Sequence, residues 1–443
     1  MVDNFAHLHA HTSIGSMQDA MTPVYKMFQR VKDLGQPALA ITDHGTMAAV
    51  FDARRAAKIH GVKYIPGCEI YFVNDLNNPK EKRRHLILLA KNEKGYRNLL
   101  QINYKGYTNY QYVPVIGKVF PKVDWDILEE HSEGIICLTA CSSGPLAPVL
   151  FERNEDGDWD KESCYIKSTQ IASRLKGIFK DDFYLEIQPH ALKVYKRDRK
   201  TGEFIPDAYG DPITIIDQTY LNQRLVQMSG ELDVPLVATC DVHYLDKEDA
   251  KAHDMLMAIN EKKPLSDKNR HRYEVDEFYV KSSGDVIGYF SELFNRKLAL
   301  QACNNSIEIA NKCEDPVYLD DDSVKFPKFD AEKEDDYKKF LAWNKKQENR
   351  AEQEDHAYMR YKCIKAFKEK MSHLKGKKRK IYRDRMISEI KVFESRNFSS
   401  YMLITSDFIK KAKEHGIRVG PGRGSVGGSL VAHLLDIHEV DPL

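Results

Sequence analysis

Side chains that bind metal ions recur beside short apolar runs in the first 245 residues of this sequence. Phe5–Ala6 precedes His9 and His11, and Ala38–Thr42 precedes His44. The same pattern recurs further along: Tyr64–Gly67 leads into Glu69, His85 opens Leu86–Ala90, Gly134–Thr139 leads into Cys141, and Leu236–Thr239 leads into Asp241 and His243. Imidazole, thiolate and carboxylate groups together suit zinc, manganese or iron rather than calcium. The recurrence predicts a polynuclear metal site.

The pair His9-x-His11 has the most specific spacing. Side chains alternate along an extended segment, so both imidazoles point to one side and can bind one ion, and His7 could join them. Glu69 and Asp241 could bridge two ions about 3.5–4 Å apart, the arrangement used to hydrolyse phosphate esters. The nucleophile would then be a metal-bound water, with no side chain assigned to that role. Taken singly, each histidine is as well explained by a place in the core, and Asp43 by a turn.

The apolar runs that precede these residues are typical of buried strands. Amphipathic segments lie between them, such as Pro23–Leu34 and Val50–His60. Alternating strands and helices predict an α/β domain with mainly parallel strands, whose ligands lie at the C-terminal strand ends. A charged insertion, Val194–Pro212, is expected to form a surface loop before a helix near Gln218–Leu232.

The sequence changes character after about residue 255 and becomes mainly helical and highly charged. Apolar periodicity predicts helices within Ser283–Ala310, Ala331–Phe393 and Met402–Lys413. Between them, Asp320 opens an acidic stretch expected to be a solvated loop. We therefore expect two domains, residues 1–265 with the metal site and residues 266–443 with the charged helices.

Composition excludes several classes of protein. The 443 residues carry a net charge of +1, and no apolar run approaches the 18 residues of a membrane span. The chain also opens without a secretory signal, so we expect a soluble, cytoplasmic protein that does not bind membranes. Its eight cysteines form no CxxC pair, which argues against a disulfide framework.

A glycine-rich segment, Gly420–Leu430, lies near the end of the sequence. It lacks the Gly-Lys-Ser/Thr ending of a Walker A loop. Glycines still let backbone amides approach phosphates, and the start of a following helix favours anions. The predicted nucleotide-binding residues are Gly422, Arg423, Gly424, Ser425 and Ser429. A tight loop between packed helices is the alternative.

A second basic feature is Lys375–Arg385, in which seven of eleven residues are Lys or Arg. It could contact DNA phosphates through a local patch, although the whole chain is nearly neutral. The predicted contacts are Lys377, Lys378, Arg379 and Lys380, and Tyr382 could stack on a base. The alternative is a solvated helix face.

Several of these motifs resemble a known family. FAHLHAHT (5–12), ALAITDHG (38–45), GCE (67–69), HLILLAKNEKGYRNL (85–99) and VATCDVHY (237–244) resemble the polymerase-and-histidinol-phosphatase (PHP) domain that opens bacterial C-family replicative DNA polymerases, the alpha subunits of polymerase III. SYMLITSDF (400–408) and VGPGRGSVGGSLVAHLL (419–435) are similar to the palm of the same polymerases.

The resemblance implies a distorted (β/α)7 barrel with three metal ions. One ion would be held by His9, His11, Glu69 and Asp241, a second by Glu69, His85 and Cys141, and a third by Asp19, His44 and His243. Asp19 departs from the family pattern, because it lies one residue further from His11 than usual. A one-residue insertion in the loop would restore its place, and Gln18 would be the poorer ligand.

The resemblance also implies a function in DNA replication. The metal site could be a 3′–5′ exonuclease that proofreads beside the polymerase. The palm would be of the polymerase beta nucleotidyltransferase type and would take a deoxynucleoside triphosphate (dNTP) with magnesium. In the family an Asp-x-Asp motif follows the glycine-rich segment, and none occurs between that segment and Leu443. Polymerisation is therefore expected to need a second chain, with DNA and other replisome subunits as further partners.

Two other readings remain open. One is a stand-alone metal phosphoesterase of the histidinol-phosphatase kind, for which the glycine-rich segment would have no use. The other is a scaffold whose metals only stabilise the fold.

Overall fold

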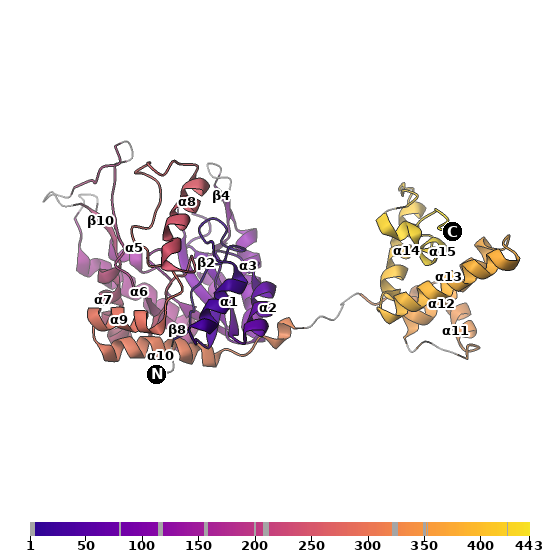
Figure 1. Ribbon diagram of the computed structural model, residues 1–443, viewed down its shortest axis with the longest axis horizontal. Coiled ribbons are helices and arrows are strands. Elements are labelled where there is room, and N and C mark those ends of the chain that lie inside the picture. The colour runs from indigo at the N-terminus through magenta and orange to yellow at the C-terminus, as the bar shows by residue number, and fades with distance from the viewer. Residues whose placement is uncertain are drawn as a thin grey trace. The chain divides into compact units, whose positions relative to one another are not determined.

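A computed structural model describes residues 5–78, 81–113, 118–154, 158–198, 201–206, 212–320, 327–348, 351, 353–422 and 424–443 (Figure 1). The chain divides into two compact units, Met1–Asp321 and Asp322–Leu443. The first unit extends past the boundary expected at residue 265, because helices α9 (Ser283–Leu293) and α10 (Arg296–Lys312) belong to it and α10 packs against strand β11 (Leu236–Ala238).

A seven-stranded sheet forms the centre of the first unit. Its order is β1-β2-β3-β7-β8-β11, and β6 also pairs with β2. The remaining strands are β1 (Ala38–Ile41), β2 (Lys63–Phe72), β3 (Arg84–Ala90), β6 (Lys122–Val123), β7 (Ile135–Leu138) and β8 (Phe183–Ile187). The predicted α/β class is confirmed, and most strand pairs are parallel. However, β3 runs antiparallel to both β2 and β7. No helix separates β2 from β3 in the sequence, so no crossover connection is present that could make these two strands parallel.

The N-terminal segment joins the two edges of this curled sheet. On one side the amide of Ala40 donates to the carbonyl of His7 at 2.8 Å. On the other side the amide of His11 donates to the carbonyl of Val242, beyond β11, also at 2.8 Å. The segment that carries His9 and His11 therefore lies between the first strand and the last.

Helices pack around the sheet, and several begin or end where the sequence predicts. They are α1 (Val24–Asp33), α2 (Val50–His60), α3 (Glu93–Thr108), α4 (Trp125–Glu130), α5 (Ala147–Leu150), α6 (Lys161–Phe179), α7 (Gln218–Leu232) and α8 (Ala250–Glu261). In α1 the apolar face of Val24, Met27, Phe28 and Val31 is buried. Helix α2 ends at Gly61, whose φ of +68° is a left-handed conformation suited to glycine.

Two short hairpins complete the first unit. Strands β4 (Gln111–Val113) and β5 (Lys118–Phe120) pair antiparallel, as do β9 (Lys193–Tyr195) and β10 (Thr214–Asp217). The second hairpin lies in and beside the insertion expected to be a loop. The expectation of a loop was wrong at the start of the insertion, because Val194 and Tyr195 belong to β9 and pair with β10.

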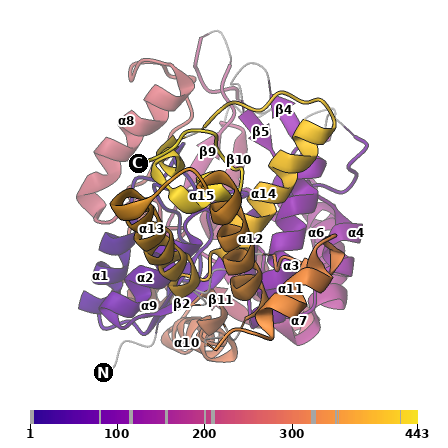
Figure 2. The same cartoon turned by 90° about the vertical axis from the view of Figure 1, so that its right-hand side faces the viewer.

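The second unit is helical and carries no strand within its described residues. The helices predicted within 331–393 are present as α11 (Tyr337–Asn344), α12 (Glu354–Lys370) and α13 (Gly376–Ser395). Helices α14 (Ser399–Glu414) and α15 (Leu430–Leu434) follow. Helix α12 packs against α11, α13, α14 and α15 (Figure 2). Tyr358, Met359 and Cys363 of α12 are fully buried at its centre.

Across the described helices of both units, none has the length and apolar character needed to cross a membrane.

Candidate metal centre

Strand direction brings the predicted ligands to one side of the sheet. Glu69 does not follow the end of a strand as expected, because β2 continues past it to Phe72. His85 lies near the start of β3, opposite Tyr71 of β2. Since β3 runs antiparallel to β2, its start lies beside the C-terminal half of β2. His85, near the start of β3, therefore lies beside ligands that come at or after the ends of other strands.

The first group of ligand atoms comes from His9, His11, Glu69 and Asp241, all of them buried. His9 Nε2 lies 2.8 Å from Glu69 Oε2, 3.0 Å from Asp241 Oδ1 and 3.1 Å from His11 Nε2. Asp241 has a φ of +49°, a left-handed conformation that few residues adopt. That backbone strain is typical of functional sites, where the surrounding fold holds it in place.

The second group shares Glu69 with the first. The Nδ1 atoms of His44 and His85 each lie 2.6 Å from Glu69 Oε1. The two oxygens of Glu69 therefore face different groups, as a bridging carboxylate requires. Cys141 lies at the margin of this group, with its sulfur 3.9 Å from His85 Nδ1.

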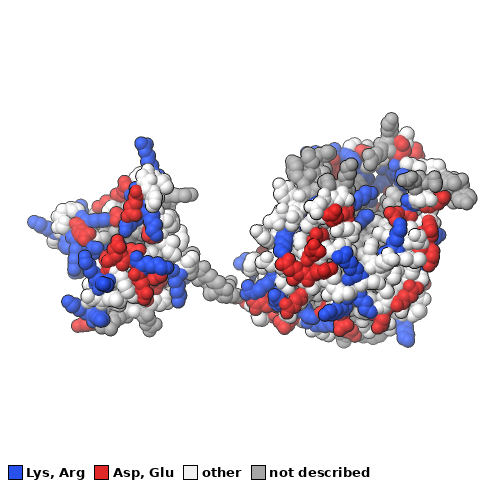
Figure 3. Space-filling model, turned by 180° about the vertical axis from the view of Figure 1, so that it is seen from behind, with Lys and Arg blue, Asp and Glu red and all other residues white. Residues whose placement is uncertain are grey.

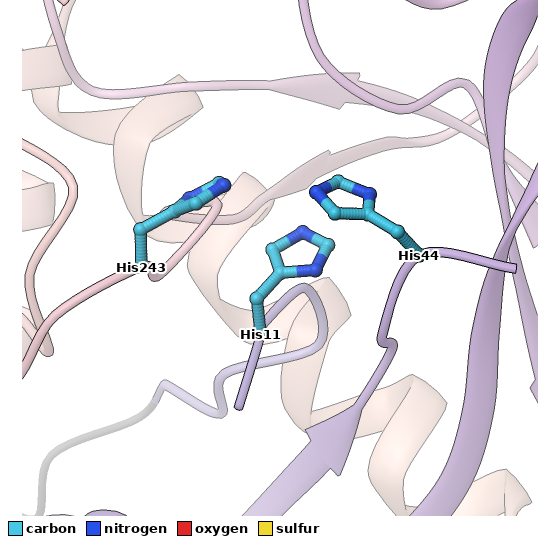
Figure 4. Close-up of side chains that lie close together, drawn as sticks. All are labelled: His11, His44 and His243. Atoms are coloured by element: carbon cyan, nitrogen blue, oxygen red, sulfur yellow. The ribbon is translucent and has the colours of Figure 1, made fainter. Parts of the chain in front are cut away.

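The third group consists of His11, His44 and His243, whose imidazoles point toward one another from three separate segments (Figure 4). The ring centroids of His11 and His44 are 4.1 Å apart, and those of His11 and His243 are 4.6 Å apart. Asp19 approaches from the side, with its Oδ2 3.2 Å from His44 Nε2. Positive charge at His44 lowers the pKa of the Asp19 carboxyl despite its burial, which acts in the opposite direction.

The donor atoms at this site fit metal ions. His243 Nδ1 donates to the backbone carbonyl of Asp241 at 2.8 Å, which leaves Nε2 as a lone-pair atom. That Nε2 and Asp19 Oδ1 are buried without a hydrogen-bond partner. Burial and the neighbouring His44 and His243 lower the pKa of His11 to about 3, so this imidazole is neutral. Neutral imidazoles beside carboxylates are metal-binding groups, and buried polar atoms without partners are otherwise costly.

Two neighbours that the sequence left open have structural roles. His7 does not join His9 and His11, because its Nε2 lies 3.1 Å from the carbonyl of Lys281, and burial lowers its pKa to about 4. Asp43 accepts hydrogen bonds from the backbone and hydroxyl of Thr12 and from the hydroxyl of Ser16. It thereby fixes the loop between the imidazoles of His11 and His44.

Sequence reasoning missed a further buried carboxylate, Glu186. It lies in strand β8, where its Oε1 is 2.7 Å from His9 Nδ1. A charged residue within the apolar strand Phe183–Ile187 was the signal that could have identified it.

The predicted nucleotide-binding residues lie in and around the short 3₁₀ segment Gly424–Gly428. Gly422, Gly424 and Ser425 are exposed, and Gly424 has a φ of +63°. Arg423 lies outside the described residues. Ser429 is differently placed, since its hydroxyl caps α15 by accepting from the amide of Ala432.

The basic segment lies on the first turns of α13. Lys377, Lys378 and Lys380 are exposed, whereas Arg379 donates to the carbonyl of Met371 at 2.7 Å and so holds the preceding turn. The suggestion that Tyr382 stacks on a base was wrong, because its ring is 2% exposed and its hydroxyl bonds to Asp441. On the face shown in Figure 3, Lys and Arg are interspersed with Asp and Glu over both units.

The acidic stretch expected to be solvated is also tied to the fold, as far as it is described. Asp320 accepts from Arg54 of α2 at 2.8 and 2.6 Å and pairs with Lys58 at 2.7 Å.

Comparison with known proteins agrees with these features. The PHP domain family matches residues 7–190, and the bacterial DNA polymerase III alpha NTPase domain matches residues 357–443. The DNA polymerase III subunit alpha of Helicobacter pylori (strain 26695) is 36% identical over 442 residues, which cover 99% of this chain and 33% of the relative. That of Campylobacter jejuni is 33% identical over 445 residues, which cover 100% of this chain and 34% of the relative. The chain thus spans about a third of the length of these curated relatives.

Structural comparison adds little to this. A protein of Bifidobacterium adolescentis assigned as a metal-dependent phosphoesterase is similar over 54% of this chain and 87% of its own, with 16% identity and a TM-score of 0.25. Because the TM-score is this low, nothing about the metal centre is inferred from this match.

Proposed function

Since this chain belongs to the DNA polymerase III alpha family and contains its PHP domain, we propose that its first unit is a metal-dependent phosphoesterase acting as a 3′–5′ exonuclease beside a replicative polymerase. The observation that carries the proposal is the convergence of the predicted ligand residues on Glu69. Seven of the nine form three overlapping groups, and within each group the donor atoms lie within 4.8 Å of one another. Asp19 and Cys141 lie beside these groups.

The proposed assignment is a trinuclear site. His9, His11, Glu69 and Asp241 would hold one ion, Glu69, His85 and Cys141 a second, and Asp19, His44 and His243 a third. Zinc, manganese and iron fit this mixture of donors. Bound ions would supply Lewis acidity and a nucleophilic water. The fold proposed around them is the family's distorted (β/α)7 barrel, with the N-terminal segment hydrogen-bonded to both edges of the sheet.

The chain's own residues would organise this chemistry. Glu69 faces two groups with its two oxygens, so its carboxylate sets the spacing between them. His243 is held in one tautomer by the carbonyl of Asp241, which directs its Nε2 into the site. The low pKa of Asp241, lowered against its burial by His9 and His243, keeps this carboxylate charged.

A small-molecule phosphatase is less well supported than a nuclease. The second unit matches the polymerase family and would serve no purpose in a phosphatase. Its glycine-rich segment would hold the triphosphate of a dNTP with magnesium, in a palm of the polymerase beta type. The Asp-x-Asp motif that polymerisation requires would come from another part of the polymerase, in the same polypeptide or in a second chain. DNA, with exposed lysines of α13 as contacts, and other replisome subunits would be partners.

The test is a 3′–5′ exonuclease assay on primed single-stranded DNA with manganese or zinc. We expect activity in the wild type that both Asp241→Asn and His9→Ala abolish. Asp33, which is exposed, and His60, which is half-buried at the end of α2, offer matched controls, and Asp33→Asn and His60→Ala should keep full activity. Hydrolysis of p-nitrophenyl phosphate without cleavage of DNA would favour the phosphatase. Neither activity, in protein shown to hold metal, would leave a scaffold.

A further inference from the structure

A cleft of about 980 Å³ opens above the candidate metal centre. Asp19, His44 and His85 contribute to its lining, so the predicted ligands are reached from this cleft. Lys82, Arg83 and Arg84 are consecutive residues of its lining and are called here the basic wall. Lys262, Lys263, Glu152 and Glu261 also line the cleft, and Lys263 is paired with Glu261 at 3.0 Å. The three consecutive cations therefore form the longest run of positive charge in the lining.

The two arginines of this wall are held in different ways. The guanidinium of Arg83 lies 3.9 Å from the centroid of the Phe120 ring, a cation–π contact. Phe120 in turn packs edge-on against Tyr71, with centroids 5.2 Å apart. Phe120 and Tyr71 both line the cleft. A row of contacting rings, each set edge-on to the next, thus leads from Arg83 toward His85, whose ring lies 5.4 Å from that of Tyr71.

The backbone of Arg84 pairs with Phe72 in the sheet, but its partly buried side chain makes no hydrogen bond or ion pair with any residue that the structure describes. Burial lowers the pKa of its guanidinium, and the carboxylates of Glu81 and Glu152, which lie beyond hydrogen-bond distance, only partly oppose this effect. A partly desolvated cation without a close partner is unfavourable by itself, and an anionic ligand would offset that cost. A guanidinium also matches a phosphate geometrically, through two parallel N–H bonds.

We propose that the wall Lys82–Arg84 binds the backbone phosphates of a single polynucleotide strand whose end reaches the metal centre, with Arg84 as a direct phosphate ligand and the Arg83–Phe120 surface as a platform for a base. The inference rests on the proposed function and adds the strand-binding site to it. A phosphomonoester has one phosphate, which the metal centre would take, and it would leave this wall without an anion. A strand supplies further phosphates beside the reacting one.

The test measures binding rather than cleavage. Full-length protein freed of metal with EDTA is titrated onto a fluorescent single-stranded DNA of twelve nucleotides, followed by anisotropy. Lys377, Lys378 and Lys380 are replaced by Gln in every variant, so that α13 does not contribute. We expect Arg84→Gln to weaken binding about tenfold and to reduce the salt dependence by about 0.7 in slope, the value for one phosphate contact on a single strand. Arg174→Gln is the control, since it removes one guanidinium from the same unit at a residue that does not line this cleft.

The outcomes separate the site from the reaction. Weaker binding in Arg84→Gln with unchanged p-nitrophenyl phosphate turnover supports the strand site. If the protein proves to have no nuclease activity but Arg84→Gln still weakens DNA binding, the strand-binding site is supported and only the proposed nuclease function is rejected. Equal binding by Arg84→Gln and Arg174→Gln overturns the inference, as does a nucleoside monophosphate that competes as strongly as the oligonucleotide.

A separate observation concerns Glu186 on β8. Its Oε1 lies 2.7 Å from His9 Nδ1 and also accepts from the hydroxyl of Thr239 and the amide of Gln188, at 2.5 and 2.9 Å. His9 and Glu186 are both almost fully buried. An Oε1 carboxylate oxygen facing Nδ1 requires the proton of His9 to be on Nδ1. With Nδ1 held by Glu186, His9 Nε2, which faces Glu69 and Asp241, is the ring atom that a metal ion would take in place of its proton.

The geometry assigns Glu186 as the positioning residue of His9, which holds its ring orientation and tautomer for metal binding. Removing a carboxylate that holds the second ring nitrogen of a metal-binding histidine lowers metal affinity about 10- to 100-fold. We expect Glu186→Ala to weaken zinc binding by that factor, measured by competition with a chromophoric chelator. Glu186→Gln should restore much of the loss, since its side-chain oxygen can still accept from Nδ1.

A double variant tells positioning from general support of the fold. If Glu186 acts through His9, then Glu186→Ala should weaken zinc binding no further in a His9→Ala background. If the losses of zinc affinity caused by the two substitutions add in full in the double variant, the assignment is overturned. Thermal melting of the metal-free proteins checks that each variant folds. Because the readout is metal affinity, the result does not depend on any nuclease activity.

Discussion

The carboxylate of Glu389 accepts a hydrogen bond from the Ser429 hydroxyl at 2.7 Å. It also accepts from the backbone amides of Leu430 and Val431 at 3.2 and 2.9 Å. The first turn of α15, where the sequence suggested that an anion would bind, is therefore held by an anionic side chain of α13. The exposed glycines before Ser429 remain the predicted contacts for phosphate.

Replacing Glu389 should destabilise the second unit. Glu389→Ala removes an acceptor from two amides and one hydroxyl at a helix start, and we expect a loss of about 2 kcal/mol in the free energy of unfolding. Urea unfolding followed by the fluorescence of Trp343, in a background where Trp125 and Trp159 are Phe, reports this unit alone. Glu414→Ala, at the exposed end of α14, should cost almost nothing. Equal losses would contradict the role of Glu389.

Asp19 rather than Gln18 should complete the metal centre. Asp19 Oδ2 lies 3.2 Å from His44 Nε2, and its other oxygen is buried without a partner. We expect Asp19→Ala to lower the metal content of the protein by one ion in three, measured by mass spectrometry of purified, reloaded protein. Gln18→Ala should keep the full content. The reverse result would show that the loop holds its ligand one residue earlier.

Metal removal should destabilise the first unit without unfolding it, because a large apolar core surrounds the sheet. A ligand that binds only the folded state adds about 2.7 kcal/mol to the free energy of unfolding when its free concentration is one hundred times its dissociation constant. We expect EDTA to lower the melting temperature of the first unit and zinc to restore it. In Asp241→Asn the shift should be much smaller, and an equal shift would place the stabilising metal elsewhere.

Arg54 should stabilise the fold through the segment that ends the first unit. Its guanidinium donates to Asp315 at 2.7 and 2.9 Å and to Asp320 at 2.8 and 2.6 Å. Since Arg54 is buried, we expect Arg54→Ala to cost about 2 kcal/mol. Lys58 pairs with Asp320 from an exposed position, so Lys58→Ala should cost less than about 0.5 kcal/mol. Urea unfolding of the two variants measures both values.

Acid should destabilise the first unit partly through His190. Burial lowers the pKa of His190 to about 4, from an ordinary value of 6.5. Between these values the unfolded chain binds a proton that the folded chain excludes, so stability falls as the pH is lowered from about 6.5 to about 4. The loss approaches 1.4 kcal/mol per pH unit for one proton. His190→Gln cannot titrate and should reduce the measured slope by up to one proton, whereas an unchanged slope would contradict the shift.

The sequence alone predicted much of the local structure and the types of the candidate ligands. The apolar spacing in Val24–Val31 predicted α1, and Gly61 predicted the end of α2, because helix periodicity and a left-handed terminus depend on neighbouring residues. The pair His9-x-His11 was visible for the same reason. The extent of β2 was not, because Pro66 and Gly67 suggest a strand end, whereas pairing with β3 continues the strand to Phe72.

Tertiary structure decided which of these residues meet. Pairing of β3 antiparallel to β2 puts His85 beside Glu69, and closure by the N-terminal segment puts His9 beside Glu186, which lies 177 residues away in the sequence. The same applies to Arg54 with Asp320 and to Glu389 with Ser429. Local propensity is set by a few adjacent side chains and can be read from them. Contacts between distant segments depend on strand order, direction and register, which the packing of the whole unit determines.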